Sequence, residues 1–125
     1  MSALEDARAH LGKAREFLEA ARINHELELD NAATSNAVTS GINSKDAICL
    51  KLTGRSNKGD NHDEARAEIR GAGAVGRALA PTFHRLLKLR PKSQYQQTSV
   101  SASDAAKAIE WATRMLDVAQ EVVSD

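Results

Sequence analysis

The sequence predicts an all-α fold: a single domain over residues 1–125, built as an antiparallel up-and-down bundle of four to five helices. Three observations lead to this prediction. Apolar residues recur at spacings of three and four, the period of an amphipathic helix. No stretch alternates with a period of two for long enough to indicate a strand. Short polar segments separate the helical runs, as in antiparallel bundles.

The first two helices are expected to form a long hairpin. The first covers residues 3–27 and has a narrow apolar seam of Leu4, Ala7, Leu11, Ala14, Leu18 and Ala21. The second begins with Asp30 or Asn31 as its N-cap and stops at Gly54. Its apolar face consists of Ala33, Ala37, Val38, Gly41, Ile42, Ile48 and Leu52. The many small residues predict close packing against a neighbour.

The third helical region covers residues 63–70 and 74–89. Its core candidates are Ile69, Val75, Leu79, Phe83, Leu86 and Leu87. A break at Gly71 and Gly73 fits this pattern, and so does a kink or a new helical segment near Pro81, which lacks an amide donor.

The last helix follows a connection over residues 91–101. Residues 101–104 offer alternative N-caps. The apolar positions of this helix are Ala105, Ala108, Ile109, Ala112, Met115, Leu116, Ala119, Val122 and Val123. Trp111 is expected in the core or at an interface.

Charge and composition restrict the class of protein. Seventeen basic residues balance seventeen acidic ones, which argues against a nonspecific DNA-coating protein. The acidic start is unlike a signal peptide, and no apolar run approaches the roughly 20 residues that span a bilayer. The single Cys49 has no partner for an internal disulfide. We therefore expect a soluble cytoplasmic protein without membrane contact.

The polar segment 55–62, between the second and third helical regions, carries the candidate catalytic residues Arg55 and His62. Arginine stays charged and binds phosphate oxygens through two donors. Histidine exchanges protons near neutral pH. Together they offer what cleavage of an RNA phosphodiester requires without a metal or another cofactor.

The bundle with this segment resembles the prokaryotic HEPN domain, whose signature is an arginine, usually a polar residue, and a histidine after a spacer of four to six residues. Here Arg55 is followed by the polar Ser56, and six residues separate it from His62. The resemblance covers most of the chain. It implies a HEPN-like fold and a homodimer in which two copies of the motif meet.

The resemblance also implies an activity: endonucleolytic cleavage of RNA to 2′,3′-cyclic phosphate and 5′-hydroxyl ends at the dimer interface. It implies a toxin or defence component, with an antitoxin such as a small nucleotidyltransferase as a further partner. The proton transfers of this reaction also favour a dimer. One histidine must accept a proton and another group must donate one, and the segment supplies one histidine per chain. The alternative is a non-catalytic HEPN-like helical module for binding or scaffolding.

Two further groups of residues are candidates for supporting roles. Asn36, Thr39, Asn43 and Asp46 lie within about 80 degrees of one another around the second helix. Either this stripe lines the cleft, with Asp46 orienting Arg55, or it is a solvated face; Asn43, Asp46 and Ser56 are taken as supporting residues. A basic cluster of Arg85, Lys88, Arg90 and Lys92 with Tyr95 is a candidate RNA-binding track, or simply a basic helix C-terminus.

Two other patterns are set aside. Residues 71–76 match the glycine pattern of dinucleotide-binding loops, but no strand precedes them and no acidic residue follows about 20 positions later. Helix packing explains these glycines better. His10 and His25 are expected at the surface, and no metal site is expected, because no second cluster completes the polar residues around His62.

Overall fold

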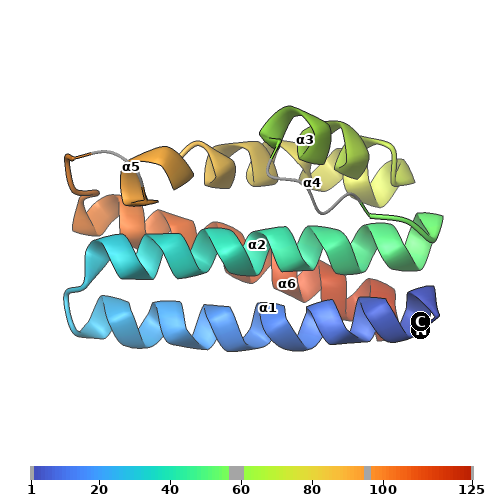
Figure 1. Cartoon of the computed structure of the whole chain (residues 1–125), viewed down its shortest axis with the longest axis horizontal. Coiled ribbons are helices and arrows are strands. Elements are labelled where there is room, and N and C mark those ends of the chain that lie inside the picture. The colour runs from blue at the N-terminus through green and yellow to red at the C-terminus, as the bar shows by residue number, and fades with distance from the viewer. Residues whose placement is uncertain (1, 57–60, 95–96, 125) are drawn as a thin grey trace.

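The computed structural model describes residues 2–56, 61–94 and 97–124, and these residues form helices without a strand. The elements are α1 (Ala3–Glu26), α2 (Asp30–Thr53), α3 (His62–Arg70), α4 (Gly73–Leu87), α5 (Arg90–Gln94) and α6 (Ala102–Ser124). Helices α1 and α2 form a long hairpin, and α3 and α4 lie on the opposite side of α2 from α1 (Figure 1). Helix α2 contacts every other helix. The predicted all-helical bundle is confirmed.

The seam of α1 is confirmed almost as predicted. Five of its six positions are buried: Ala7, Leu11, Ala14, Leu18 and Ala21. Leu4, in the first turn, is 36% exposed. The helix begins where the Ser2 hydroxyl accepts a hydrogen bond from the Glu5 amide at 3.1 Å.

The predicted N-cap of α2 is wrong, whereas its end is confirmed. Asp30 is the first helical residue, and Leu29 occupies the cap position without a side-chain hydrogen bond. The Asn31 side chain instead accepts from the Val100 amide (2.9 Å), so it holds the segment that leads into α6. The helix ends at Gly54, whose φ of 78° is the left-handed conformation that favours glycine.

The break in the third helical region lies at the glycines and not at Pro81, which is inside α4. Gly73 has a φ of 79°. Gly76 is buried against the end of α3, where a Cβ would lie 1.8 Å from the Ile69 carbonyl oxygen. These positions explain the glycine pattern of residues 71–76 by helix packing.

Two predicted core positions besides Leu4 are wrong. Leu52 is 46% exposed and Val75 is 36% exposed. The buried residues Ile69, Leu79, Phe83, Leu86 and Leu87 confirm the rest of the third region.

The connection before the last helix is shorter than predicted, since α5 forms one helical turn within it. Helix α6 begins after Ser101, whose hydroxyl accepts from the Asp104 amide (3.0 Å), so Ser101 is the cap among the alternatives. The apolar side of α6 packs into the core, and Trp111 packs against it while half-buried. No helix in the three described ranges is long and apolar enough to cross a membrane.

Candidate functional site

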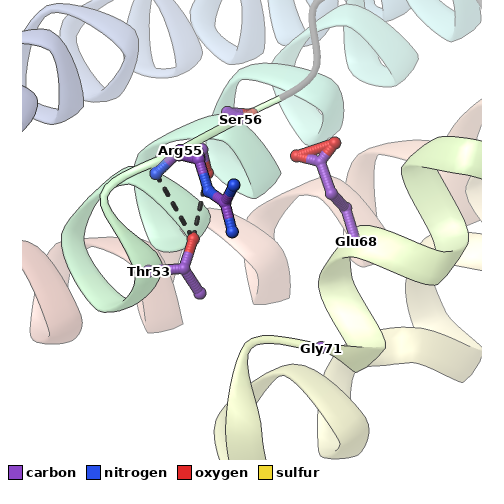
Figure 2. A pocket seen from close by; sticks show the side chains of 5 residues that line it. All are labelled: Thr53, Arg55, Ser56, Glu68 and Gly71. Atoms are coloured by element: carbon purple, nitrogen blue, oxygen red, sulfur yellow. Dashed lines mark hydrogen bonds between the residues drawn. The ribbon is translucent and has the colours of Figure 1, made fainter.

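Arg55 lies just beyond the end of α2, where the Thr53 hydroxyl contacts its backbone. The Thr53 hydroxyl lies 3.4 Å from the Arg55 amide nitrogen and 3.1 Å from the Arg55 carbonyl oxygen (Figure 2). The same hydroxyl donates to the Cys49 carbonyl oxygen (2.7 Å), so the turn is tied to the last turn of α2. Arg55 therefore leaves the helix in a defined direction, although its side chain is exposed.

The Arg55 side chain lines an open pocket of about 470 Å³, together with Thr53, Ser56, Glu68 and Gly71. Among the described residues, the guanidinium has no hydrogen-bond or ion-pair partner. The Glu68 side chain points from α3 toward the segment that carries Arg55 and Ser56 (Figure 2). The pocket thus combines a donor-rich cation with one carboxylate.

A buried ion pair on α2 holds the segment that carries Arg55 and Ser56. Lys45 on α2 is 1% exposed, and its Nζ lies 2.6 Å from Asp46 Oδ1. Lys45 Nζ also lies 3.7 Å from Glu68 Oε1 and donates to Ser56 Oγ at 3.3 Å. Ser56 Oγ in turn donates to Asp46 Oδ1. Three elements, α2, α3 and the segment after α2, therefore meet at one ammonium group.

Asn43 and Asp46, two members of the polar stripe of α2, are buried, so this part of the stripe is not a solvated face. The Asn43 carbonyl oxygen lies 2.8 Å from His10 Nδ1. Since that oxygen only accepts, His10 donates from Nδ1. Asp46 binds Ser56, so the expected contact between Asp46 and Arg55 is absent. His10 is half-buried, contrary to the surface position predicted for it.

The other two members of the stripe also serve the helix hairpin. The Asn36 amide donates to Asn24 Oδ1 on α1 at 2.8 Å. The Thr39 hydroxyl donates to the Ser35 carbonyl oxygen one turn earlier, at 3.0 Å. Neither residue is a lining residue of the pocket that holds Arg55.

His62 is the first residue of α3, and its helix terminus is well capped. The Asn61 side chain accepts from the amides of Asp63 (2.9 Å) and Glu64 (3.2 Å). His62 Nε2 lies 3.1 Å from Arg90 Nη1. Because a guanidinium only donates, Nε2 accepts this hydrogen bond and the imidazole is neutral in it. An unprotonated imidazole nitrogen can serve as a general base once Arg90 no longer donates to it.

The two signature residues line different pockets. His62 lines a second pocket of about 310 Å³ between α3 and α4, with Arg66, His84 and Lys88 among its neighbours. Residues 57–60, which join Arg55 and Ser56 to Asn61, lie outside the described ranges. Ser56 is tied to Asp46 and Lys45, while His62 is tied to Arg90.

Part of the predicted basic cluster gathers around His62. Lys88 lines the His62 pocket, and Arg90 binds the imidazole. Arg85 is exposed on α4, and Lys92 is half-buried on α5. Tyr95 lies outside the described residues. The cluster is thus divided between the His62 pocket and the outer surface of the bundle.

Sequence reasoning missed two groups of residues near the pockets. Lys45 is buried, like its neighbours in residues 43–50. A lysine next to an aspartate, close to apolar residues, was the available sequence signal for a buried ion pair. Arg66, Arg70 and Arg77 line a third pocket, with His84, between α3 and α4. Their positions depend on how α3 packs against α4. The break at Gly71 and Gly73 did not by itself predict that packing.

Two side chains have shifted acidities. Burial raises the pKa of the Cys49 thiol to about 11; the charge of Lys45 lowers this pKa by a smaller amount, and the carboxylates of Glu68 and Asp46 raise it. Partial burial lowers the pKa of His84, and the positive charges of Arg66, Lys88, Arg70 and Arg85 lower it further. Within the described ranges, no group of three or more His, Cys, Asp or Glu side chains is placed to hold a metal ion.

Comparisons with known proteins add no family to this description. The sequence matches no protein-family model, and no curated protein matches it.

Proposed function

We propose that this protein is a metal-independent endoribonuclease of the HEPN type that acts as a homodimer. One observation carries the proposal: an exposed guanidinium at the end of α2 and a neutral imidazole at the start of α3 occupy the two ends of one short segment. A cation that binds phosphate and a base that accepts a proton are the two functions that transesterification of RNA needs.

The reaction uses the substrate's own 2′-hydroxyl as the nucleophile. His62 accepts the 2′-hydroxyl proton while the 2′-oxygen forms a bond to phosphorus, and the bond to the 5′-oxygen breaks. That oxygen takes a proton from a second acid and leaves as a 5′-hydroxyl. Arg55 stabilises the charge that grows on the non-bridging oxygens. The products are a 2′,3′-cyclic phosphate and a 5′-hydroxyl.

The second acid is His62 of a partner copy in its protonated form, because the segment supplies one histidine per chain and that imidazole must first take up the proton that it gives to the 5′-oxygen. A twofold axis that passes near the Arg55 pocket would bring two copies of both residues together. The exposed Leu52 lies next to Thr53, a lining residue of that pocket, and supplies apolar surface for such an interface. A cytoplasmic toxin or defence role, with an antitoxin such as a small nucleotidyltransferase, belongs to the same proposal.

The test is an RNA cleavage assay in EDTA with two matched substrates. One is a single-stranded RNA, and the other carries 2′-deoxyribose at every position. The proposal expects cleavage of the RNA only, with cyclic phosphate and 5′-hydroxyl ends. Cleavage of the deoxy strand would refute attack by the 2′-hydroxyl. Sedimentation that shows only monomer at micromolar concentration would refute the composite site.

The separation of the two residues favours one other function. Arg55 and His62 line different pockets, and Arg90 occupies His62 Nε2. These features also suit a HEPN-like module that binds RNA or a partner protein without cutting it. This second function predicts that RNA binds to the protein and is recovered intact.

A further inference from the structure

A positively charged groove runs between α3 and α4. It consists of two adjoining pockets of about 470 and 310 Å³, which share Arg66 and His84 as lining residues. Arg70 and Arg77 line the larger pocket, and Lys88 and His62 line the smaller one. We call this surface the α3–α4 groove. It extends from Arg70, the last residue of α3, to the proposed catalytic residue His62, the first residue of α3.

The cations of this groove are poorly compensated. The Nε atom of Arg66 is buried and has no hydrogen-bond partner, and Arg66 Nη1 lies 3.6 Å from an Asp63 carboxylate that is 91% exposed. A contact so long and so exposed contributes little. In the described part of the chain, Arg70, Arg77 and Lys88 form no ion pair. Among the described residues that line the two pockets, Asp63 is the one acidic residue.

Such an accumulation is unusual for a chain whose charges sum to zero. Burial is the largest cause of the lowered pKa of His84, and the charges of Arg66, Lys88 and Arg70 lower it further, so these cations disfavour another positive charge in the groove. Gathering cations without counter-ions costs stability unless an anion neutralises them. A buried Arg66 Nε without a partner is likewise a donor that a ligand oxygen would satisfy.

We propose that the α3–α4 groove binds the phosphate backbone of single-stranded RNA and leads the strand to His62. Forked guanidinium donors suit phosphate oxygens, and the two successive pockets offer separate places for successive phosphates. Of the described residues, no Phe, Tyr or Trp lines either pocket, so the contacts are to the backbone and carry little sequence preference. This inference rests on the proposed function for its choice of RNA over other polyanions.

The groove differs from the RNA-binding track expected from sequence. Of the described members of that track, Lys88 alone is a lining residue of the groove. Arg66, Arg70 and Arg77 are further cations in its lining. The strand therefore passes between α3 and α4 and not along α5.

The test measures binding of a single-stranded 2′-O-methyl RNA, which lacks the nucleophile and stays intact. The triple variant Arg66→Gln, Arg70→Gln, Arg77→Gln is compared with a control triple variant, Arg8→Gln, Arg15→Gln, Arg114→Gln, which removes three exposed arginines from α1 and α6. We expect the groove variant to bind at least about tenfold more weakly, and the slope of log K against log salt to fall by about 2, as for three lost phosphate contacts. The control variant should bind like the wild type.

Equal weakening in the two triple variants would overturn the inference, and so would no weakening in either. Poly-glutamate that competes as well as unlabelled RNA would show an acidic protein site instead. The single variant Arg77→Glu, at an exposed position, repeats the test if the triple variant loses its helical circular dichroism. Wild-type protein that binds through the groove but never cleaves RNA would refute the nuclease and leave the groove assignment standing.

Discussion

Arg90 Nη1 lies 3.1 Å from His62 Nε2, so a residue of α5 holds the imidazole at the start of α3. This contact fixes which nitrogen carries the proton, since the guanidinium can only donate. It also means that Arg90 must leave Nε2 before that nitrogen can accept a proton from a substrate. A phosphate of the incoming RNA is a suitable new partner for Arg90.

The first prediction concerns the tautomer of His62. In nitrogen NMR spectra near neutral pH, His62 should be neutral, with its proton on Nδ1. Arg90→Gln should change the Nε2 signal, whereas Lys92→Gln, which removes a charge from the same helix, should not. A doubly protonated His62 in the wild type would contradict this reading of the contact.

Lys45 provides the second prediction. Lys45→Met leaves the carboxylate of Asp46 buried without the ammonium group that neutralises its charge, which should lower the free energy of unfolding by about 3 kcal/mol in urea titrations. Adding Asp46→Leu should restore much of that loss, because an apolar pair needs no compensation. Equal stability of Lys45→Met and wild type would show that the pair does not anchor the segment.

The third prediction compares two glycines. Gly76→Ala should lower the free energy of unfolding by about 1–3 kcal/mol, because the added Cβ would lie 1.8 Å from the Ile69 carbonyl oxygen. Gly12→Ala, in α1 with nothing within 4 Å of its Cβ, should raise it by up to about 1 kcal/mol. Thermal or urea unfolding of both variants checks the contact between α3 and α4.

The fourth prediction is a pH dependence that arises from His84. Its pKa is lowered in the folded protein, so the unfolded chain binds the proton more readily as the pH falls below 6.5. Stability is therefore lost with falling pH. His84→Gln should lose less stability than the wild type between pH 7.5 and 5.5.

The charged groups that act on His84 are Arg66 and Arg70 on α3, Arg85 on α4, and Lys88 directly after α4. His62 and Asp63 line the same pocket. All of them are common to wild type and variant, so the difference between the two pH profiles isolates His84. Identical profiles would contradict the lowered pKa.

Much of the bundle could be predicted from the sequence because helical periodicity is a local property. The α1 seam, the stop at Gly54 and the break at Gly71 and Gly73 all follow from patterns within one or two turns. The positions of Leu52, Val75 and Asn31 depend on which helix lies opposite, and local spacing holds no information on this.

The candidate site could be predicted only in part, for a similar reason. Arg55 and His62 are recognisable from their types and from their place between two helices. The role of Lys45 required knowledge that α3 brings Glu68 over the end of α2. The α3–α4 groove likewise depends on how two short helices fold together.

The most direct test of the central claim is the rate of RNA cleavage in EDTA by wild type, Arg55→Ala and His62→Ala. Arg15→Ala and His25→Ala, on α1, serve as controls of matched residue type. The account predicts cleavage by the wild type and both controls, and a loss of about 100-fold or more in each signature variant, as for a missing catalytic proton carrier or phosphate contact. Equal cleavage in the signature variants, or no cleavage by any of the five proteins, would contradict it.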